Sequence, residues 1–314
     1  MGRRTGSSPA LRVAVRVGAA AVVGAAVATP LLRRRARIPV PVTIAACAAG
    51  PLALSVLTPR SKKRDVALFA MQMWAFTMVH ELPYDDPERL RARLRTRYPI
   101  ALDRALGSGS LPSARLQRAL ARFGRVKALN RVLTWAHWLW FFEPHLALIL
   151  ILVRHNERFP RAARQLAAVF DLGCAVYFIA PTAPPWWSSE QGLTGEEVRR
   201  VMVEVGEETW GSAWPGMYGA LGGNPWAAMP SLHFATALTA ALLLAEAGPV
   251  EGAVGWGYAL TLGFALVYLG EHYVTDLAAG ALLVAAVRRG EPLAEPLVRR
   301  VNGSLQRLER LAII

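Results

Sequence analysis

Long apolar blocks, rather than alternating apolar and polar faces, dominate the pattern along this chain. Each of the clearest blocks is about long enough, at ~1.5 Å of helix per residue, to cross a hydrocarbon layer of about 30 Å. These blocks are 131–153, 166–181, 229–247, 252–270 and 272–288, and the stretches 12–32 and 38–58 predict two more spans. Segment 65–82 is ambiguous: with Asp65 and His80 at its ends, it can either cross the membrane or lie in its interface.

The predicted fold is therefore all-α, a polytopic transmembrane bundle of six to eight helices, because lipid cannot satisfy the open backbone groups of other structures. Composition agrees with this prediction. The 314 residues are 54% hydrophobic and only 18% charged, and the mean hydropathy is +0.28. These values are too apolar for an ordinary soluble domain.

The net charge of +14 is dispersed among the loops between apolar blocks. Cytoplasmic arginines and anionic lipid headgroups account for such a distribution, so we expect no nucleic-acid partner. Cys47 and Cys174 lie far apart inside apolar runs and are expected to be small buried hydrophobes. Arg3, Arg4 and the run ending at 26–28 imitate a secretory signal, but the next apolar block follows almost at once, which favours an uncleaved helix.

Positive residues indicate the orientation of the core. The loop 154–164 carries four arginines and the tail from residue 288 onward carries six, so both are assigned to the cytoplasm. The loop 182–228 has two arginines against six glutamates, which suits the outside. Tracing the helices between these anchors places His233 and His272 at the same outer face.

The stretch 85–130 conflicts with this count, because it is placed outside although it is rich in arginine. Its pattern, broken at Pro99, 107–109 and Pro112, is typical of short amphipathic helices lying on lipid headgroups. The arginines at 33–35 and 37 present a similar conflict. The topology before residue 130 is therefore left open.

Two histidine motifs open apolar blocks in the last third of the chain, Met-Pro-Ser-Leu-His at 229–233 and Gly-Glu-His-Tyr-Val-Thr-Asp at 270–276. A lone histidine in an apolar helix is usually a packed core residue. Two histidines at matching depth, with Asp276 four residues after His272 and so expected on the same helical face, instead indicate a functional site, because ionisable groups at membrane depth are costly. A metal site that adds Glu271, or a proton relay in a transporter, are the alternatives.

The motifs Pro-Ser-Leu-His at 230–233 and His-Tyr-x-x-Asp-Leu-x-x-Gly at 272–280 resemble the second and third signatures of the type 2 phosphatidic acid phosphatase superfamily, which shares its site with vanadium haloperoxidases. Leu232, where lipid phosphatases usually have Gly, and the stretch 177–186 are closer to the inositol phosphorylceramide synthase-like branch. The similarity covers roughly residues 110–290.

The resemblance implies roles for the matching positions. His272 is expected to be the nucleophile that forms a phosphohistidine, Asp276 to fix its tautomer, and His233 to be the general acid. Ser231 and the backbone N–H groups that start the following helix are expected to hold phosphoryl oxygens. The implied mechanism needs no cofactor and no metal.

Two parts of the family pattern are missing. A lysine followed seven residues later by Arg-Pro does not occur, and the arginine expected six residues before the nucleophile is Leu266. A transferring phosphoryl group still needs cationic or dipolar stabilisation. The candidates just before the 131–153 helix are Arg115, Arg122, Arg125 and Lys127. His137 and the aromatic residues around it are expected to be core or an interfacial belt, and Glu143 or His145 are weaker candidates for lining a substrate cavity.

Together the resemblance and the pattern predict N-terminal membrane helices (1–64), an amphipathic interfacial region (65–130), a phosphatase-like transmembrane catalytic core (131–290) and a basic cytoplasmic tail (291–314). The expected function is a cell-membrane enzyme, multi-pass, whose site faces outside and acts on lipid phosphates or lipid phosphodiesters. Transfer of a headgroup to a hydroxyl acceptor is slightly favoured. Simple hydrolysis of a lipid or polyprenyl phosphate is the alternative, and a non-catalytic transporter is the alternative of another class.

Overall fold

The structure of the protein, a computed structural model, describes residues 8–121, 126–221 and 223–313. Within them the regular structure is helical, and β-pairing is limited to isolated bridges of Thr182 with Arg95 and with Ala227. The chain forms two compact units, one of residues 1–85 and 289–314 and one of residues 86–288. The second unit contains both histidine motifs.

The first unit contains the helices α1 (Pro9–Leu32), α2 (Val40–Leu57) and α3 (Lys62–Glu81), the 3-10 turn η1 (Leu82–Asp85) and the end of α15 (Val274–Ile313). The second unit contains α4 (Pro87–Ala92), α5 (Arg97–Leu106), α6 (Pro112–Leu120), α7 (Val126–Leu139), α8 (Glu143–Arg154), α9 (Phe159–Ile179) and α10 (Pro185–Glu190). It continues with α11 (Val201–Trp210), the 3-10 turn η2 (Gly211–Ala213), α12 (Trp214–Leu221), α13 (Leu232–Ala247), α14 (Pro249–Tyr268) and the first part of α15.

Four helices in the described part of the chain are long and apolar enough to cross a membrane, α1, α2, α9 and α14, and the pair α7 and α8 adds a fifth if it is one span. The predicted number of six to eight spans is therefore not confirmed. The block 229–247 yields only the 16 residues of α13, because the chain before Leu232 is a loop that ends in the Ser231 cap. Segment 65–82 lies in α3, which does not meet the criteria for a span.

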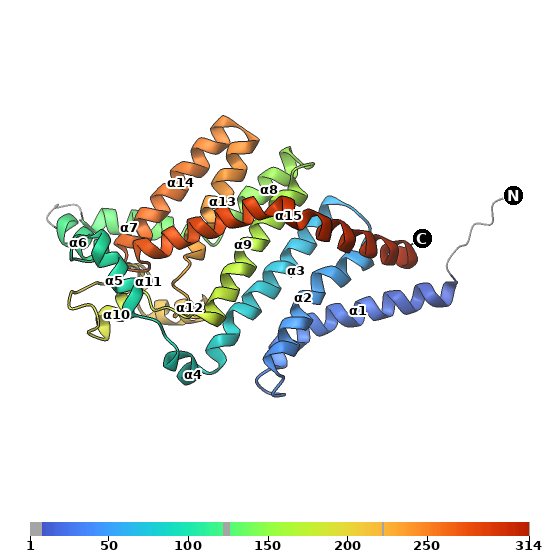
Figure 1. Ribbon diagram of the computed structural model, residues 1–314, viewed down its shortest axis with the longest axis horizontal. Helices are drawn as coiled ribbons and strands as arrows, with labels where there is room; N and C mark the ends of the chain where they lie inside the picture. The colour runs from blue at the N-terminus through green and yellow to red at the C-terminus, as the bar shows by residue number, and fades with distance from the viewer. Residues whose placement is uncertain (1–7, 122–125, 222, 314) are drawn as a thin grey trace. The chain divides into compact units, whose positions relative to one another are not determined.

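In the first unit, α2 packs against both α1 and α3 (Figure 1). Gly50 permits this contact, because a Cβ at that position would come within 2.7 Å of the Ala26 Cβ. Arg33, just after α1, is buried and its Nε lies 2.7 Å from Asp85 Oδ2 at the end of η1. Arg33 and Arg34, which conflict with the sequence-based topology, thus have acidic partners at and just after the end of α3.

The predicted span 131–153 is not continuous. α7 ends at Leu139, α8 begins at Glu143, and the two helices are bent by 53° at the break. Pro144 explains the break, because it has no N–H to donate to a carbonyl oxygen of the preceding turn.

In the second unit, α13 and α14 lie side by side as a close antiparallel pair (Figure 1). Small residues allow the approach, since a Cβ on Gly252 or Gly255 would lie 2.8 Å from the backbone of Ala245 or Ala241. α13 also packs against α8 and α9. α13 is therefore the central helix of this unit, and it carries His233 in its first turn.

The start of α15 packs closely against the start of α13. A Cβ on Gly280 would lie 2.8 Å from the carbonyl oxygen of Ser231 and 3.4 Å from the Ala235 Cβ. Gly280 therefore sets the separation of the two helix starts on which the histidine motifs lie.

The opposite end of α13 is an ion-pair cluster. Glu246 accepts from Arg161 at 2.6 Å and from Arg288 at 2.5 Å. These arginines come from two regions assigned to the cytoplasmic side on charge, and the 16 residues of α13 separate them from Ser231 by about 24 Å. Arg161 and Arg288 thus lie at one end of the unit, and the histidine motifs lie at the other.

We expect Gly280→Ala to destabilise the second unit by about 1–3 kcal/mol, because the new methyl group meets backbone that cannot move without separating α13 from α15. Gly257→Ala is the matched control, since Gly257 is a helix-interior glycine with open space where the Cβ would lie. The control should be neutral or stabilising by up to about 1 kcal/mol through helix propensity. Thermal unfolding in detergent measures both, and equal midpoints would contradict the close approach.

Candidate functional site

Three side chains from the two histidine motifs form a continuous hydrogen-bonded chain. His233 Nδ1 lies 3.1 Å from His272 Nε2, and His272 Nδ1 lies 3.3 Å from Asp276 Oδ2. His272 and Asp276 are buried, while His233 is half-buried. The structure thus brings together the three residues that the sequence predicts for the centre of the site.

The order of the chain fixes where the protons lie. An ionised Asp276 can only accept, so His272 carries its proton on Nδ1 and its Nε2 holds a lone pair. The proton between the two rings therefore belongs to His233 Nδ1, which donates to His272 Nε2. Asp276 orients the His272 ring as a catalytic carboxylate orients its histidine. His233 donates its proton to the lone pair on His272 Nε2.

His272 is not part of α15, contrary to the expectation that it and Asp276 share a helical face. α15 begins at Val274, and His272 lies in the turn before it. Asp276 reaches back to this turn, where its Oδ2 accepts both from His272 and from the Tyr273 backbone N–H at 2.9 Å. The carboxylate thus closes the first turn of the helix and holds the imidazole with the same oxygen.

Asp103, on α5, holds the same helix start from outside. Its two carboxylate oxygens accept from the backbone N–H groups of Val274 and Thr275 and from the Thr275 hydroxyl, each at 2.9 Å. The side chain is fully buried. An ionised residue at a helix N-terminus is stabilised by the free N–H groups and the helix dipole, so Asp103 caps α15 from a distant part of the chain.

The start of α13 is fixed in a similar way. The Ser231 hydroxyl caps the helix by accepting from the Phe234 N–H at 3.2 Å, and the Ser231 N–H donates to the Asp276 carbonyl oxygen at 3.0 Å. Tyr177, on α9, donates its buried hydroxyl to the Pro230 carbonyl oxygen at 2.7 Å. The predicted phosphoryl-binding residue Ser231 therefore lies at the helix start, two residues before His233, and ties the two motifs together.

A buried ion pair anchors the residue before His272. Arg200 donates from Nε to Glu271 at 2.9 Å and from Nη2 at 3.2 Å, it also donates to the Tyr218 hydroxyl, and it stacks on the Trp186 ring at 3.9 Å. Burial by itself raises the pKa of Glu271, but the charge and hydrogen bonds of Arg200, with the nearby rings of His137 and His272, bring that pKa below its usual value. Glu271 is therefore ionised, and the loop is held by a satisfied pair.

Gly270 allows this loop to turn. Its φ is +81°, and a Cβ there would lie 2.6 Å from the carbonyl oxygen of Arg199. The Val201 N–H then bonds to the Leu269 carbonyl oxygen at 3.2 Å, which joins the start of α11 to the end of α14. The nucleophile candidate thus lies on a loop whose backbone is fixed on both sides.

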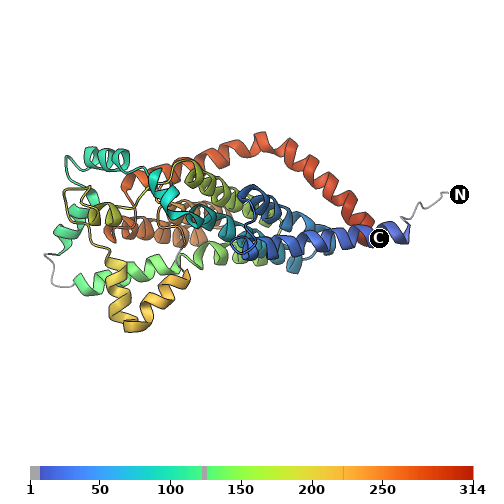
Figure 2. The ribbon, with the colours of Figure 1, turned by 90° about the horizontal axis from the view of Figure 1, so that it is seen from below.

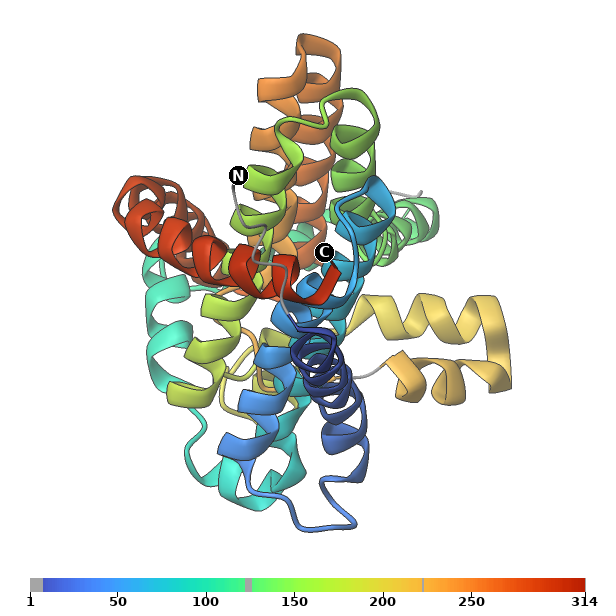
Figure 3. The same ribbon diagram turned by 90° about the vertical axis from the view of Figure 1, so that its right-hand side faces the viewer.

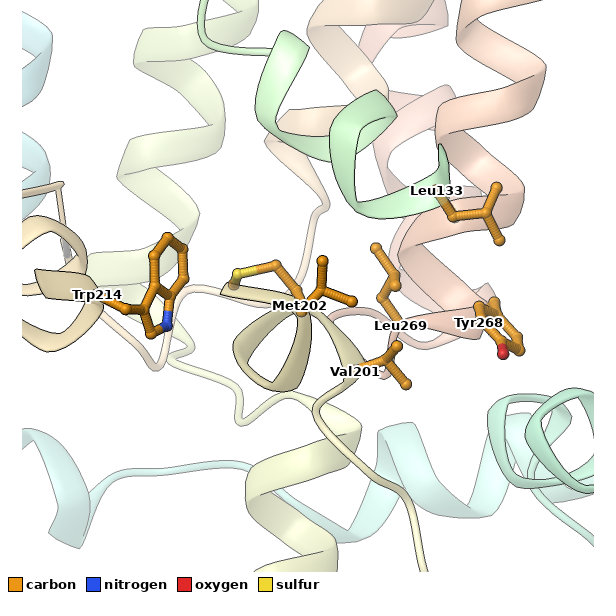
Figure 4. Packing of buried hydrophobic residues seen from close by; sticks show 8 residues of the cluster. Leu133, Val201, Met202, Trp214, Tyr268 and Leu269 are labelled. Atoms are coloured by element: carbon orange, nitrogen blue, oxygen red, sulfur yellow. The ribbon is translucent and has the colours of Figure 1, made fainter. Parts of the chain in front are cut away.

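An apolar cluster supports the loop. Val201, Met202 and Val205 of α11 pack with Leu133 of α7 and with Tyr268 and Leu269 at the end of α14 (Figure 4). Figure 2 shows α11 beside α7, and Figure 3 shows α11 and α12 folded back on each other. The second contact requires Gly206, because a Cβ there would overlap the Trp214 ring at 2.2 Å. The loop 182–228, which is predicted to face outside, therefore contains helices that pack against this end of the second unit.

Aromatic rings surround His233 on its other side. The ring of Trp140 lies 4.2 Å from that of His233 and its Nε1 donates to the Thr236 hydroxyl at 2.8 Å. The ring of His137, on α7, lies 5.0 Å from His233. The break between α7 and α8 therefore brings an aromatic turn and a third histidine to the site.

The other predicted phosphate-binding residues have different positions. Arg115 is exposed and donates to the Gly107 carbonyl oxygen at 2.8 Å, and Lys127 is exposed at the start of α7. Arg122 and Arg125 lie outside the described residues. The roles of these four residues as phosphate ligands stay predictions. Within the described residues, no group of three possible metal ligands is arranged around a common point.

Three residues of the site were not predicted from the sequence, Asp103, Arg200 and His137. Asp103 and Arg200 lie 171 and 71 residues from the groups they hold, so no local spacing indicates them. The only available signal for Arg200 was its position in a loop that is otherwise acidic.

We expect Asp103→Ala to lower stability by about 0.5–2 kcal/mol, the usual cost of losing a helix cap, and to loosen the turn that carries His272. Asp86→Ala is the matched control, because Asp86 caps the short helix α4 by accepting from the Arg89 N–H at the exposed surface. Thermal unfolding measures both variants. A larger loss for Asp86→Ala would contradict the role assigned to Asp103.

We expect Arg200→Lys to destabilise the fold by about 1–3 kcal/mol, because lysine cannot reproduce the two-pronged bond to Glu271 or the stacking on Trp186. The neighbouring Arg199 pairs with Glu204 at the exposed surface, so Arg199→Lys should change stability by less than about 0.5 kcal/mol. Denaturant unfolding of the two variants is the measurement. Equal losses would show that Arg200 is no more than a surface charge.

The comparisons with known proteins agree with the geometry. A family model described as the PAP2 superfamily matches residues 100–288, which is more than half of the chain and includes both histidine motifs. Neither a curated protein nor a solved structure gives a significant match. The narrower resemblance to the inositol phosphorylceramide synthase-like branch stays a prediction. The chain belongs to the PAP2 superfamily, the superfamily of type 2 phosphatidic acid phosphatases that its motifs resemble.

Proposed function

We propose that this protein is an integral-membrane enzyme that transfers a phosphoryl or phospho-headgroup unit from a lipid phosphate or lipid phosphodiester through a phosphohistidine at His272. Membership of the superfamily supports a phosphatase or phosphotransferase. The single observation that carries the finer proposal is the chain of bonds from Asp276 to His272 to His233. It supplies an oriented nucleophile and a proton donor in one place.

The first step uses the lone pair of His272. Its Nε2 attacks phosphorus, the N–P bond forms, and the P–O bond to the leaving alcohol or phosphate breaks. A protonated, cationic His233 gives its Nδ1 proton to the leaving oxygen and becomes neutral. The positive charge that develops on the His272 ring is stabilised by the Asp276 carboxylate at 3.3 Å.

The second step reverses these roles. Water or a hydroxyl group attacks the phosphohistidine, its proton goes to His233, the new O–P bond forms and the N–P bond breaks. Water as the acceptor makes the protein a phosphatase, and a lipid or sugar hydroxyl makes it a phosphotransferase. Transfer is favoured slightly, because the motif details that depart from lipid phosphatases, Leu232 and the stretch 177–186, are those of the synthase-like branch.

Substrate has to enter between the two histidines. With 3.1 Å between His233 Nδ1 and His272 Nε2, the two nitrogens are in direct contact, and phosphorus fits between them only if this hydrogen bond opens. His233 is half-buried and His272 is buried. We therefore expect His233 to move when substrate enters, while Asp276 keeps His272 fixed.

The proposed site faces the outside of the cell membrane. The charge distribution supports this orientation, because the arginine cluster around Glu246 lies at the opposite end of α13 from Ser231. Arginine-rich ends of membrane helices are favoured on the cytoplasmic side. At the site end, by comparison, Glu196, Glu204 and Glu271 each pair with one arginine, Arg118, Arg199 and Arg200 respectively.

Product analysis of the purified protein tests the proposal. The protein in detergent is given a panel of lipid phosphates and headgroup lipids, with and without alcohol acceptors, and the products are compared with those of His272→Ala. We expect wild type to release phosphate or to form a new lipid, a phosphohistidine to be trapped after acid-free quenching, and both signals to be abolished in His272→Ala. EDTA should leave the activity intact, since no step uses a metal.

Two further variants sharpen the assignment. Asp276→Asn should lower kcat on the order of 10²–10⁴-fold, because the amide can hold the wrong tautomer of His272. His155→Ala is the matched control: His155 lies between α8 and α9, outside the site, and its removal should leave turnover unchanged. Wild-type activity in His272→Ala would overturn the mechanism, and proton or substrate flux in liposomes without any product would favour a transporter.

A further inference from the structure

His137 is a buried histidine whose hydrogen-bonding capacity is unused. Its residue is 6% exposed, and neither Nδ1 nor Nε2 has a hydrogen-bond partner among the described residues. A buried polar group left without a partner costs about 1–3 kcal/mol, and nearly all such groups in folded proteins are paired. An imidazole with both nitrogens unpaired therefore requires an explanation beyond packing.

The buried face of α7 carries polar residues at helical spacing. Asn130, Thr134 and His137 follow one another at four and three residues, so they lie on one face of the helix, and all three are buried. Asn130 is paired, since its Oδ1 accepts from the Tyr268 hydroxyl at 2.6 Å. At one end of this polar face Asn130 is hydrogen-bonded, and at the other end His137 makes no hydrogen bond with the described residues.

His137 lies at the proposed active site. Its ring centroid is 5.0 Å from that of His233, the ring that has to leave its bond with His272 when substrate enters. The carboxylate of Glu271, next to His272 in the chain, is within electrostatic range of both His137 and His272. His137 thus lies beside the centre at which phosphorus would be held.

Arg200 is a second group near this centre that the family motifs do not supply. In contrast to His137, it already makes several hydrogen bonds. Its guanidinium already bonds to both carboxylate oxygens of Glu271 and to the Tyr218 hydroxyl, and its face is covered by Trp186. Using those donors for a ligand would break a buried ion pair, which is strongly unfavourable. The Nε and Nη2 donors of Arg200 are therefore committed to positioning Glu271, whereas neither ring nitrogen of His137 is committed to a partner among the described residues.

We propose that His137 donates a ring N–H to a non-bridging oxygen of the phosphoryl group that His272 receives. This inference rests on the proposed function. It assigns to His137 part of the stabilisation that the missing lysine and arginines of the family pattern would give, since negative charge on the non-bridging oxygens is present throughout the transfer. Binding of the phosphoryl group also satisfies a polar group that is otherwise buried without a partner.

Inhibition by orthovanadate tests this contact. Vanadate is a tetrahedral oxyanion that becomes five-coordinate when a histidine nitrogen binds it, so it resembles the transferring group. A hydrogen bond to a charged oxygen contributes about 1.5–3 kcal/mol, or roughly 10- to 150-fold in affinity. We expect His137→Phe and His137→Leu, which lack any N–H, to raise the vanadate inhibition constant by that factor.

Two variants separate the contact from a general disturbance of α7. His137→Gln keeps an amide N–H and should recover most of the lost vanadate affinity. Thr134→Val removes a buried, unpaired hydroxyl one turn away on the same face, with no change in size, and should leave the inhibition constant within about twofold of wild type. Thermal unfolding of each variant confirms that the protein compared is folded.

The outcomes distinguish this inference from the function on which it rests. If wild type forms the phosphohistidine and His137→Phe and His137→Leu keep the wild-type inhibition constant, the role of His137 is wrong and the proposed function stands. The role is also wrong if Thr134→Val loses as much affinity as His137→Phe, or if His137→Gln recovers none. Absence of both phosphohistidine and vanadate inhibition in wild type overturns the proposed function and this inference together.

Discussion

The Asp276 carboxylate is the point on which the rest of the site depends. One of its oxygens accepts from His272 and from the Tyr273 N–H, and the backbone carbonyl of the same residue accepts from the Ser231 N–H at the start of α13. A single residue therefore ends the loop, starts α15 and joins the two histidine motifs. The close approach at Gly280 and the cap from Asp103 serve the same junction, because each holds one side of the α15 start against its neighbour. Orientation of a reacting group to within tenths of an ångström requires support of this kind.

The sequence predicts the site residues that belong to the two short histidine motifs. His233, His272 and Asp276 are brought together as expected, because helix parity places both motifs at one end of the bundle and because Asp276 is four residues from His272. The helical class is also predicted, since long apolar blocks allow little else. What the pattern could not give is the exact extent of the helices. Pro144 interrupts the block 131–153, which hydropathy predicts to be one span. The helix cap at Ser231 shortens the block 229–247.

The residues that the sequence did not indicate act across long separations in the chain. Asp103 reaches the start of α15 from α5, and Arg200 reaches Glu271 from the loop before α11. Neither has a periodic or motif signature, because its role is defined by where the fold brings it and not by its neighbours in sequence. The arginines of the 85–130 stretch were the more conspicuous cations, yet Arg115 bonds within that stretch and Arg118 pairs with Glu196. The number of arginines in the 85–130 stretch therefore did not indicate that Arg200, in another loop, is the arginine next to the histidine motif.

The buried polar groups at this end of the unit include some whose hydrogen bonds are satisfied and some, such as the ring nitrogens of His137, whose hydrogen bonds are not. Asp103, Arg200 and Tyr177 use their polar atoms on backbone or on an opposite charge, which rigidifies the loops around His272. The bond between His233 and His272 belongs to neither class, because it satisfies the nucleophile only until substrate arrives. Under the proposed function, opening that bond costs free energy that new contacts to the phosphoryl oxygens must offset. A protein without the cations of the family pattern needs those contacts from other groups. Under the role proposed for His137, its buried and unpaired imidazole is such a donor, which becomes satisfied when the phosphoryl group is bound.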